Sequence, residues 1–422
     1  MEPFPIMKYR PTFHPTASYG WINDPNGFSY FNGEFHLYAQ HNPHDLVWGP
    51  IHWLHFTSKD LIHFEEKGIV LKPDQPYDQD LGCFSGSAII KDNKMYVLYT
   101  SASNNIQTQS LAISEDGYHF NKYENNPVLS EKDLPEGYLI SDFRDPKIIL
   151  YQGTYYVLLV ARHKDQYSSI LLYKTTDLIH YEFVNVIKSF LNMEENGMVE
   201  CPDLLCDNGK WALIYSFQHP SNYQKDFTVC YQVGDFDFAK GVFTPIGIEH
   251  ELEQGLVGYA SHTIKVDGQN YYVSWLSSWG INYPSKEEGY AGVLSLIKKI
   301  NIVGDRLYIN FLANHPRSHI IDGEVTADKA KISLENIDLF IDKNNNYLEI
   351  YRHDLDTKII NDKNIEITNQ VVKLNDASHI HLEIIIDHSV IEIVVNHGEA
   401  FLGIDNYRHD IEKYKVLTTN IK

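Results

Sequence analysis

The chain has 422 residues, of which 43% are hydrophobic and 13% aromatic, enough for a large packed core and for two or three domains. Its 35 basic and 56 acidic residues give a formal net charge of −21. This acidic balance excludes nucleic acid and anionic membrane surfaces as expected partners, because both are bound through a basic face.

The N-terminal stretch MEPFPIMKYRPTFHP lacks the apolar core of a signal peptide, and no run of 18 apolar residues suggests a membrane span. The four cysteines are too sparse for a disulfide framework, and their spacing is not typical of structural zinc. They are Cys83, Cys201, Cys206 and Cys230. We therefore expect a reduced, cytoplasmic protein with no metal site.

The first motif in the chain is WINDPNGF at 21–28. Asp24-Pro25-Asn26-Gly27 has the composition of a tight turn, since Asp and Asn favour turn starts, Pro presets φ and Gly accepts a positive φ. Trp21 and Phe28 flank it as candidates for burial. By composition alone, Asp24 would be a turn residue.

Five later segments share one pattern, a turn followed by an aromatic-rich strand. They are FNGEFHLYAQ, KDNKMYVLYT, YQGTYYVLLV, DNGKWALIYS and VDGQNYYVSW, and their turn residues are Gly33, Asn93, Gly153, Gly209 and Gly268. The spacings are 60, 60, 56 and 59 residues. A shorter repeat, SKDLIHFE, SEDGYHFN and TTDLIHYE, runs alongside it. Repeated units of short strands predict a five-bladed β-propeller over 1–302.

The pattern changes after the fifth unit. Alternating strands with few aromatic residues follow, such as KISLENIDLFID and HLEIIIDHSVIEIVVN. Such alternation is typical of antiparallel sheets with one buried face. We predict an all-β chain in which the propeller is followed by a linker at 303–316 and a C-terminal antiparallel β-sandwich at 317–422. The exposed edges of a sandwich permit a homo-oligomer without requiring one.

Three acidic residues occupy similar positions in their units. Asp24, Asp145 and Glu200 lie 8 or 9 residues before the turn residue, and Ser85 and Tyr259 occupy this position in the other two units. In a propeller, rotation about the axis would bring these positions together. Crowded carboxylates repel one another, which costs stability but separates their pKa values for acid–base catalysis.

Each of these acids also has a structural alternative. Asp145 could form a surface ion pair with Arg144, which is common and contributes little. Glu200 could lie on a solvated strand face. The shared position in three units favours a joint catalytic role over three separate accidents.

At these residues the chain resembles glycoside hydrolase family 32, the family of invertases and β-fructofuranosidases. Its signatures are similar to WINDPNG, GCFSGSA, FRDPK and ECPDL, in this order along the chain. The resemblance implies that Asp24 is a nucleophile, Glu200 the general acid and base, and Asp145 a residue that stabilises the transition state. It also implies hydrolysis of terminal β-D-fructofuranosyl units from sucrose, sucrose 6-phosphate or short fructo-oligosaccharides through a covalent intermediate, with no cofactor.

The resemblance further implies a set of substrate-binding residues around the three acids. They are Asn23, Gln40, Trp48, Phe84, Ser85, Arg144 and Tyr259. Trp279 is a candidate aromatic platform for a sugar, whereas Trp275 is equally explained by core packing. Cys201, next to Glu200, is expected to face the other side of its strand and to pack.

Three alternative functions stay open at this stage. A fructosyltransferase would use the same three acids, with a sugar in place of water as acceptor. A non-catalytic sugar-binding propeller is disfavoured because all three acids are present, and an arabinoside or xyloside hydrolase is disfavoured by the signatures. In the fifth unit, Val257–His262 departs from the family pattern, as does Val199, which leaves the leaving-group side and the preferred fructoside open.

Overall fold

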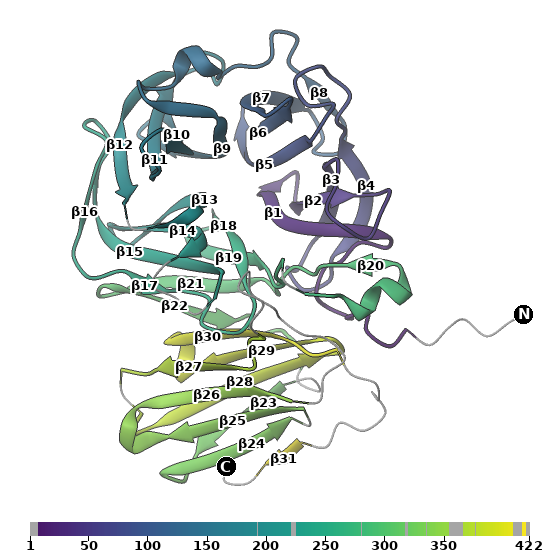
Figure 1. Cartoon of the computed structure of the whole chain (residues 1–422), viewed down its shortest axis with the longest axis vertical. Coiled ribbons are helices and arrows are strands. Elements are labelled where there is room, and N and C mark those ends of the chain that lie inside the picture. Colours follow the sequence, from purple (N-terminus) through teal and green to yellow (C-terminus); the bar gives the residue numbers. More distant parts are fainter. Residues whose placement is uncertain are drawn as a thin grey trace, which may run out of the picture.

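The computed structural model describes residues 7–191, 193–220, 225–279, 281–316, 320–334, 336–353, 366–375, 377–407 and 416–418. These residues form seven β-sheets and short 3₁₀ helices, which confirms the predicted all-β class. In Figure 1 five sheets are grouped in the upper part and two layered sheets lie below them. Within the described residues, no helix is long and apolar enough to cross a membrane.

The first two sheets are formed by the first two repeat units. The first has the order β20-β1-β2-β3-β4, with β1 (Gly20–Phe31), β2 (Glu34–Asn42), β3 (His52–Ser58), β4 (Glu65–Leu71) and β20 (Tyr290–Ala291). The second runs in chain order through β5 (Gly82–Lys91), β6 (Lys94–Ser103), β7 (Ile106–Ser114) and β8 (Phe120–Lys122).

The next three sheets follow the same plan, with the first strand of each unit innermost. The third contains β9 (Tyr138–Tyr151), β10 (Thr154–His163), β11 (Ser168–Thr175) and β12 (Glu182–Phe190). The fourth contains β13 (Met193–Asp207), β14 (Lys210–Pro220), β15 (Phe227–Asp237), β16 (Val242–Pro245) and β17 (His250–Glu251). The fifth contains β18 (Tyr259–Val266), β19 (Gln269–Trp275), β21 (Lys298–Val303) and β22 (Arg306–Phe311). Helices η1 (Glu131–Asp133) and η2 (Pro284–Glu288) lie in the connections.

The predicted repeat corresponds to the first hairpin of each sheet. Each repeated glycine or asparagine has a positive φ, and so does the residue before it, as in Asn32-Gly33 with φ values of 51° and 84°. Positive φ at both central residues matches the right-handed strand twist in a two-residue hairpin. The repeat length of roughly 60 residues is therefore the number of residues from one such hairpin to the next.

The shorter repeat forms one capping turn three times. Asp60 accepts the backbone N–H groups of Ile62 and His63, and its other oxygen lies 2.7 Å from His63 Nδ1. Asp116 and Asp177 make the same contacts at the same distance to their own histidines. This repeat is structural, because its hydrogen bonds close the connection between the third and fourth strands of each unit and its histidines, His63, His119 and His180, are exposed.

The innermost strands of the five sheets contact one another in chain order. β1 contacts β5, β5 contacts β9, β9 contacts β13, β13 contacts β18, and β18 contacts β1. Figure 1 shows them facing a common centre. This arrangement brings the predicted positions near the strand starts into one region.

Residues after 316 form two further antiparallel sheets. One has the order β23 (Ile320–Val325), β28 (Ile380–Asp387), β29 (Val390–Val395) and β30 (Ala400–Asp405). The other has the order β27 (Asn369–Lys373), β26 (Tyr347–Arg352), β25 (Ile337–Asp342), β24 (Lys329–Leu334) and β31 (Val416–Thr418). Helices η4 (Lys343–Asn345) and η5 (Asn396–Gly398) close two hairpins. Alternate residues of β24 and β26 are buried, which is typical of an antiparallel sheet with one buried face.

The predicted linker at 303–316 is wrong over 306–311. These residues form β22, which pairs with β21 through six residue pairs from Lys298↔Phe311 to Val303↔Arg306. Alternate side chains of β22 are buried, so this strand completes the fifth sheet. Parts of the predicted 317–422 domain lie outside the described residues.

The two C-terminal sheets are joined to the first part of the chain by a buried interface. The Gln254 and Leu256 backbone N–H groups donate to Phe401 and Gly403 carbonyls at 3.0 and 2.9 Å. Lys298 Nζ and Glu392 Oε1 form a fully buried ion pair at 2.8 Å. Separation of the two parts would expose these groups unpaired.

Candidate active site

Every innermost strand has a β-bulge near its start, where two residues oppose one on the neighbouring strand. The bulged pairs are 23–24, 84–85, 145–146, 201–202 and 260–261. A bulge bends the strand and redirects side chains. Asp145, Cys201 and Ala260 have φ values of 61°, 47° and 51°, which are rare outside glycine and typical of functional sites.

Asp24 is buried within β1 and accepts hydrogen bonds from three side chains. Ser85 Oγ donates at 2.5 Å and Gln40 Nε2 at 3.0 Å to Oδ2, while Asn23 Nδ2 donates at 3.0 Å to Oδ1. Burial raises the pKa of Asp24, the hydrogen bonds from Ser85 and Asn23 oppose that rise, and the charge of Glu200 adds to it. The structure thus brings together four residues predicted from different parts of two units.

The turn interpretation of Asp24-Pro25-Asn26-Gly27 is wrong, because β1 continues through all four residues. Gly27 does have a positive φ, 52°, but at a second bulge in the strand. A Cβ there would lie 2.7 Å from the Tyr38 ring. Glycine is therefore needed for close packing inside a sheet rather than for chain reversal.

Glu200 is held by two residues from neighbouring inner strands. Arg144 donates to Oε1 from Nη2 at 2.8 Å and from Nε at 3.1 Å, and the Tyr259 hydroxyl donates to Oε2 at 2.5 Å. Asp142, which sequence reasoning missed, accepts from Arg144 Nη1 at 3.1 Å. The carboxylates nearby raise the pKa of Arg144 despite its burial, so Glu200 faces a permanent cation.

Asp145 lies between these two groups. Its Oδ2 accepts the backbone N–H of Cys201 at 2.9 Å and lies 4.0 Å from Arg144 Nε. Burial raises the pKa of Asp145 to about 7; Arg144 opposes this rise, and the charges of Glu200 and Asp24 add to it. The Asp145 carboxyl group therefore gains or loses its proton near neutral pH, as expected for crowded carboxylates.

Cys201 belongs to the site, so its predicted position on the opposite strand face is wrong. Its Sγ lies 3.7 Å from both Asp24 Oδ2 and Asp145 Oδ2. The positive φ at Cys201 turns its side chain inward, which simple alternation along a strand does not anticipate. Burial and the nearby carboxylates raise the pKa of this thiol well above its usual range, so it remains a neutral S–H group.

The three acids are not strictly equivalent in the repeat. Asp145 and Cys201 share the positive-φ position of the bulge, whereas Glu200 lies one residue earlier, as do Arg144 and Tyr259. This offset makes two neighbouring groups, one around the Asp24 and Asp145 carboxylates and one around Glu200.

Aromatic residues flank the Asp24 side of the cluster. Trp48 is 38% exposed, and its ring centroid lies 6.0 Å from that of Phe84. Trp279 is only partly buried, but one face of its ring stacks on Trp21 at 5.5 Å. Trp21 in turn donates from Nε1 to Asn23 Oδ1 at 2.8 Å, so it orients a residue bound to Asp24.

Trp275 is fully buried and packs against both Trp21 and Trp279, with ring centroids 5.7 and 5.1 Å away. Its role is core packing. Of the two predicted tryptophans, only Trp279 retains a surface that a ligand could contact.

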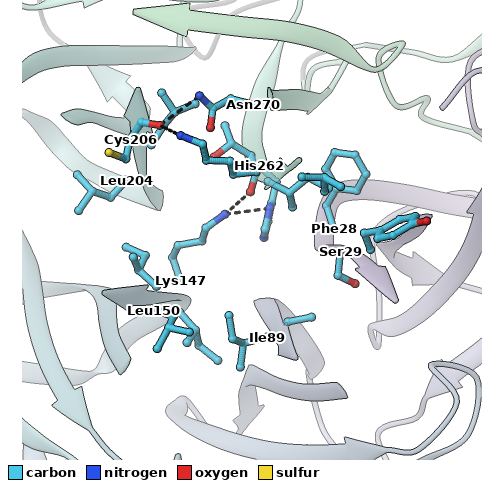
Figure 2. Close-up of a pocket in the computed structure, with 18 of the residues that line it drawn as sticks. Phe28, Ser29, Ile89, Lys147, Leu150, Leu204, Cys206, His262 and Asn270 are labelled. Atoms are coloured by element: carbon cyan, nitrogen blue, oxygen red, sulfur yellow. Dashed lines mark hydrogen bonds between the residues drawn. The ribbon is translucent and has the colours of Figure 1, made fainter. Parts of the chain in front are cut away.

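A separate pocket of about 540 Å³ lies further along the inner strands. Asp24, Asp145 and Glu200 are not among the residues that line it. Figure 2 shows Lys147 and His262 at its centre among apolar side chains such as Ile89 and Leu204. Lys147 Nζ is bonded to Asp203 Oδ2 at 2.9 Å and to Thr263 O at 2.6 Å. These two central residues also line a small cavity with Asp145 and Cys201, so they separate the pocket from the acids.

The comparisons with known proteins agree on one family. Residues 14–310 match the model of the glycosyl hydrolases family 32 N-terminal domain. A raffinose invertase of Escherichia coli is 30% identical over 93% of this chain and 88% of its own length. A sucrose-6-phosphate hydrolase of Streptococcus mutans is 30% identical over 94% of this chain and 88% of its own length.

Solved structures give the same result over nearly the whole chain. The sucrose-6-phosphate hydrolase from Lactobacillus gasseri superposes with a TM-score of 0.85 at 26% identity, covering 97% of this chain and 92% of that one. A family 32 β-fructofuranosidase of Bombyx mori, solved as a mutant in complex with sucrose, has a TM-score of 0.80 at 28% identity, covering 96% and 90%.

Proposed function

Because this chain belongs to glycoside hydrolase family 32, we propose that Asp24, Asp145 and Glu200 carry out its reaction, the hydrolysis of terminal β-D-fructofuranosyl units. The enzyme is a β-fructofuranosidase-type glycoside hydrolase. The observation that carries the residue assignment is the chain of contacts Ser85–Asp24–Cys201–Asp145, with Glu200 bound beside it by Arg144.

Asp24 is the nucleophile in this proposal. Three donors hold its carboxylate oriented, and two of them, Ser85 and Asn23, oppose the rise in pKa that burial causes, so Asp24 can attack the anomeric carbon of the fructosyl unit. The attack breaks the bond to the glycosidic oxygen and forms a covalent fructosyl ester. Glu200 donates its proton to the departing oxygen and then takes a proton from the water that hydrolyses the ester.

Arg144 and Tyr259 set the position of Glu200, and Asp145 accepts hydrogen bonds from sugar hydroxyls as positive charge develops in the transition state. Asn23, Gln40 and Ser85 shape the fructose side of the site through Asp24. Trp48, Phe84 and Trp279 supply apolar surface at its entrance. No step in this scheme needs a cofactor.

The two carboxylic acids can be told apart by substrate choice. Asp24→Asn and Glu200→Gln should both lose about 10³-fold or more in kcat on sucrose. With β-fructosyl fluoride, whose leaving group needs no proton, Glu200→Gln should recover much of the first step, whereas Asp24→Asn should not. Equal loss of both variants on both substrates would contradict these roles.

The preferred fructoside is the finer part of the proposal. Relatives at about 30% identity include an invertase and sucrose-6-phosphate hydrolases, so we propose sucrose or its 6-phosphate as substrate. Comparison of kcat/KM for sucrose, sucrose 6-phosphate, 1-kestose and inulin measures this preference. A preference for inulin would contradict it.

We also propose that the five sheets form a closed five-bladed β-propeller followed by the β-sandwich. Support comes from the contact of β18 with β1 and from the parallel pairing of Gly20–Trp21 with Tyr290–Ala291, which links the first and fifth units. A crystal structure with bound fructose tests the closure and the carboxyl separation of about 5–5.5 Å that a retaining mechanism requires.

A cytoplasmic location is proposed from the cysteines. All four are free, and Cys83 and Cys230 are buried in the core, as is usual in a reducing compartment. Measurement of fructosidase activity in separated cell fractions tests this location.

A further inference from the structure

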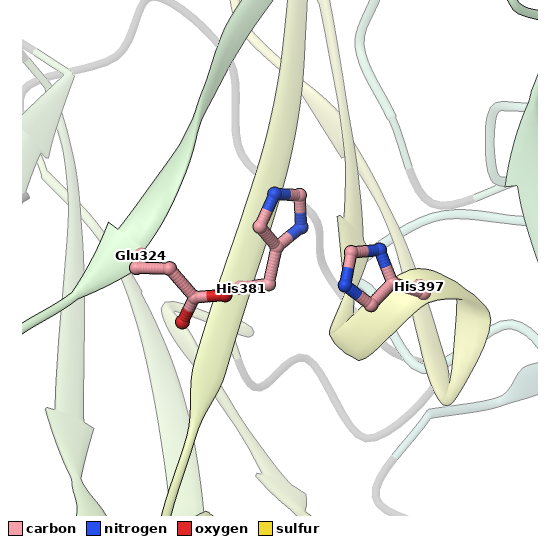
Figure 3. Close-up of side chains that lie close together, drawn as sticks. All are labelled: Glu324, His381 and His397. Carbon is pink, nitrogen blue, oxygen red and sulfur yellow. The ribbon is translucent and has the colours of Figure 1, made fainter. Parts of the chain in front are cut away.

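The C-terminal sandwich contains a cluster of potential metal ligands that the sugar chemistry does not use. Glu324 on β23 lies directly opposite His381 on β28, and His397 belongs to η5. One ligand atom from each of the three residues lies within 4.8 Å of the other two. Figure 3 shows the three side chains gathered on one face of this sheet.

His381 is oriented as a metal-binding histidine would be. Its Nε2 lies 2.7 Å from Asp322 Oδ1, whereas its Nδ1 is buried and makes no hydrogen bond. In the neutral ring, Nε2–H donates to Asp322 and Nδ1 keeps its lone pair. A carboxylate that fixes the tautomer of a ligating histidine is the usual outer partner in metal sites.

The side chain of Asn396 helps to hold the neighbouring residue His397 next to the His381 ring. The His381 backbone N–H donates to Asn396 Oδ1 at 3.0 Å, so the residue before His397 is tied to β28. The imidazole rings of His381 and His397 lie 4.2 Å apart between centroids, with 23° between their planes. Because the His397 side chain is exposed, its ring can rotate so that a nitrogen points to the same centre as the other ligands.

The donor set indicates the class of ion. Two imidazole nitrogens and one carboxylate suit Zn²⁺ and similar transition metals, whereas Mg²⁺ and Ca²⁺ prefer oxygen ligands alone. Glu383 Oε1 lies 4.0 Å from His381 Nδ1 and, with water, is a candidate for the fourth position. We propose that Glu324, His381 and His397 bind a divalent transition metal, with Zn²⁺ the best fit and Asp322 as the positioning residue.

Such an ion would strengthen the junction between the two parts of the molecule. Gly398 of η5 packs on β22 so closely that a Cβ there would lie 2.8 Å from the Ile309 backbone. A metal that joins His397 to β23 and β28 fastens η5 to the sandwich, while η5 rests on the fifth sheet. The expected consequence is higher stability rather than a change in fructoside hydrolysis.

The test uses the full chain, freed of metal by a chelator and titrated with ZnCl₂ in a calorimeter. We expect one equivalent to bind and the thermal midpoint to rise with Zn²⁺ concentration, because an ion that binds the folded state stabilises it. Asp322→Asn should weaken binding by about 10–100-fold. His381→Gln and His397→Asn should weaken it further; asparagine tolerates the positive φ of 55° at residue 397.

His379→Asn is the matched control, since His379 is exposed and lies just outside β28. It should bind Zn²⁺ like the unmodified protein, and all variants should keep their fructosidase activity, which shows that they are folded. Equal Zn²⁺ affinity in His397→Asn and the unmodified protein would overturn the site. A Co²⁺ complex with the weak absorption of a hydrated octahedral ion would also overturn it.

Discussion

Replacement of Asp145 by asparagine should stabilise the folded enzyme at neutral pH while it removes activity. Asparagine keeps an oxygen that can accept the Cys201 backbone N–H, a bond of 2.9 Å in the structure. It removes a carboxylate that is buried beside Glu200 and Asp24. The change therefore removes charge crowding with little loss of packing, as in other sites where activity is maintained at a cost in stability.

The pH dependence follows from the raised pKa. The folded state holds the Asp145 proton up to about pH 7, whereas the usual pKa is 3.8. Between these values the folded state binds a proton that the unfolded chain has lost, so the unfolding free energy falls as pH rises. At about 1.36 kcal/mol per pKa unit, this rise in pKa costs roughly 4 kcal/mol of unfolding free energy above pH 7. Asp145→Asn removes this cost.

The measurement is urea unfolding of both proteins at several values between pH 4 and pH 8. All six tryptophans precede residue 280, so their fluorescence reports on the part with the active site. The advantage of Asp145→Asn should be small near pH 4, should grow with pH and should level off above pH 7. A difference that stays constant with pH would refute the crowding of these carboxylates.

Asp177→Asn is a control in which the substitution should change the unfolding free energy in the opposite direction. Although partial burial acts to raise the pKa of Asp177, hydrogen bonds from His180 and the backbone hold it below the usual value. Its ionised form therefore stabilises the fold above the unfolded-state pKa, and this contribution disappears in acid. The variant should be less stable than the unmodified protein at neutral pH and should approach it as the pH falls.

Three further predictions follow from individual contacts. Arg144→Lys should lower kcat/KM by about 10²–10³-fold with unchanged circular dichroism, because it loses the paired donors to Glu200; activity within threefold would contradict this. Glu392→Ala should lower the unfolding free energy by about 3–5 kcal/mol, because it leaves the buried Lys298 without its ionic partner. An unchanged midpoint of thermal unfolding would contradict a stabilising role of the Lys298–Glu392 ion pair. Iodoacetamide at pH 8 should label Cys201 only after unfolding, since its thiol stays protonated; mass spectrometry of the native protein would detect the contrary result.

Much of the fold could be predicted because its signals are local. The five Gly or Asn turns mark hairpins whose residues themselves require positive φ, and the spacing of these turns repeats the unit of the sheet. Strand alternation likewise predicted antiparallel sheets after residue 316. β22 was missed because six residues after a short turn carry too little pattern to distinguish a last strand from a linker.

The sequence predicted most of the residues of the candidate site but not how they are arranged. Asp24, Asp145 and Glu200 stand at similar distances from their turns, so the sequence alone determined that one acid from each of three units belongs together. It also determined Asn23, Gln40 and Ser85, through their resemblance to known signatures.

The geometry of the site was decided by tertiary structure. Near the start of each inner strand a bulge inserts an extra residue, and the positive φ of Cys201 in its bulge turns that side chain toward Asp24. Glu200, one residue before its bulge, lies level with Arg144 and Tyr259, which precede theirs. Residue alternation predicts side-chain direction only in regular strands, whereas bulges and positive φ values depend on how neighbouring strands pair. The sequence thus determined that the three acids and their predicted neighbours meet. The pairing of strands added Cys201 and Asp142 to them and determined which atoms touch.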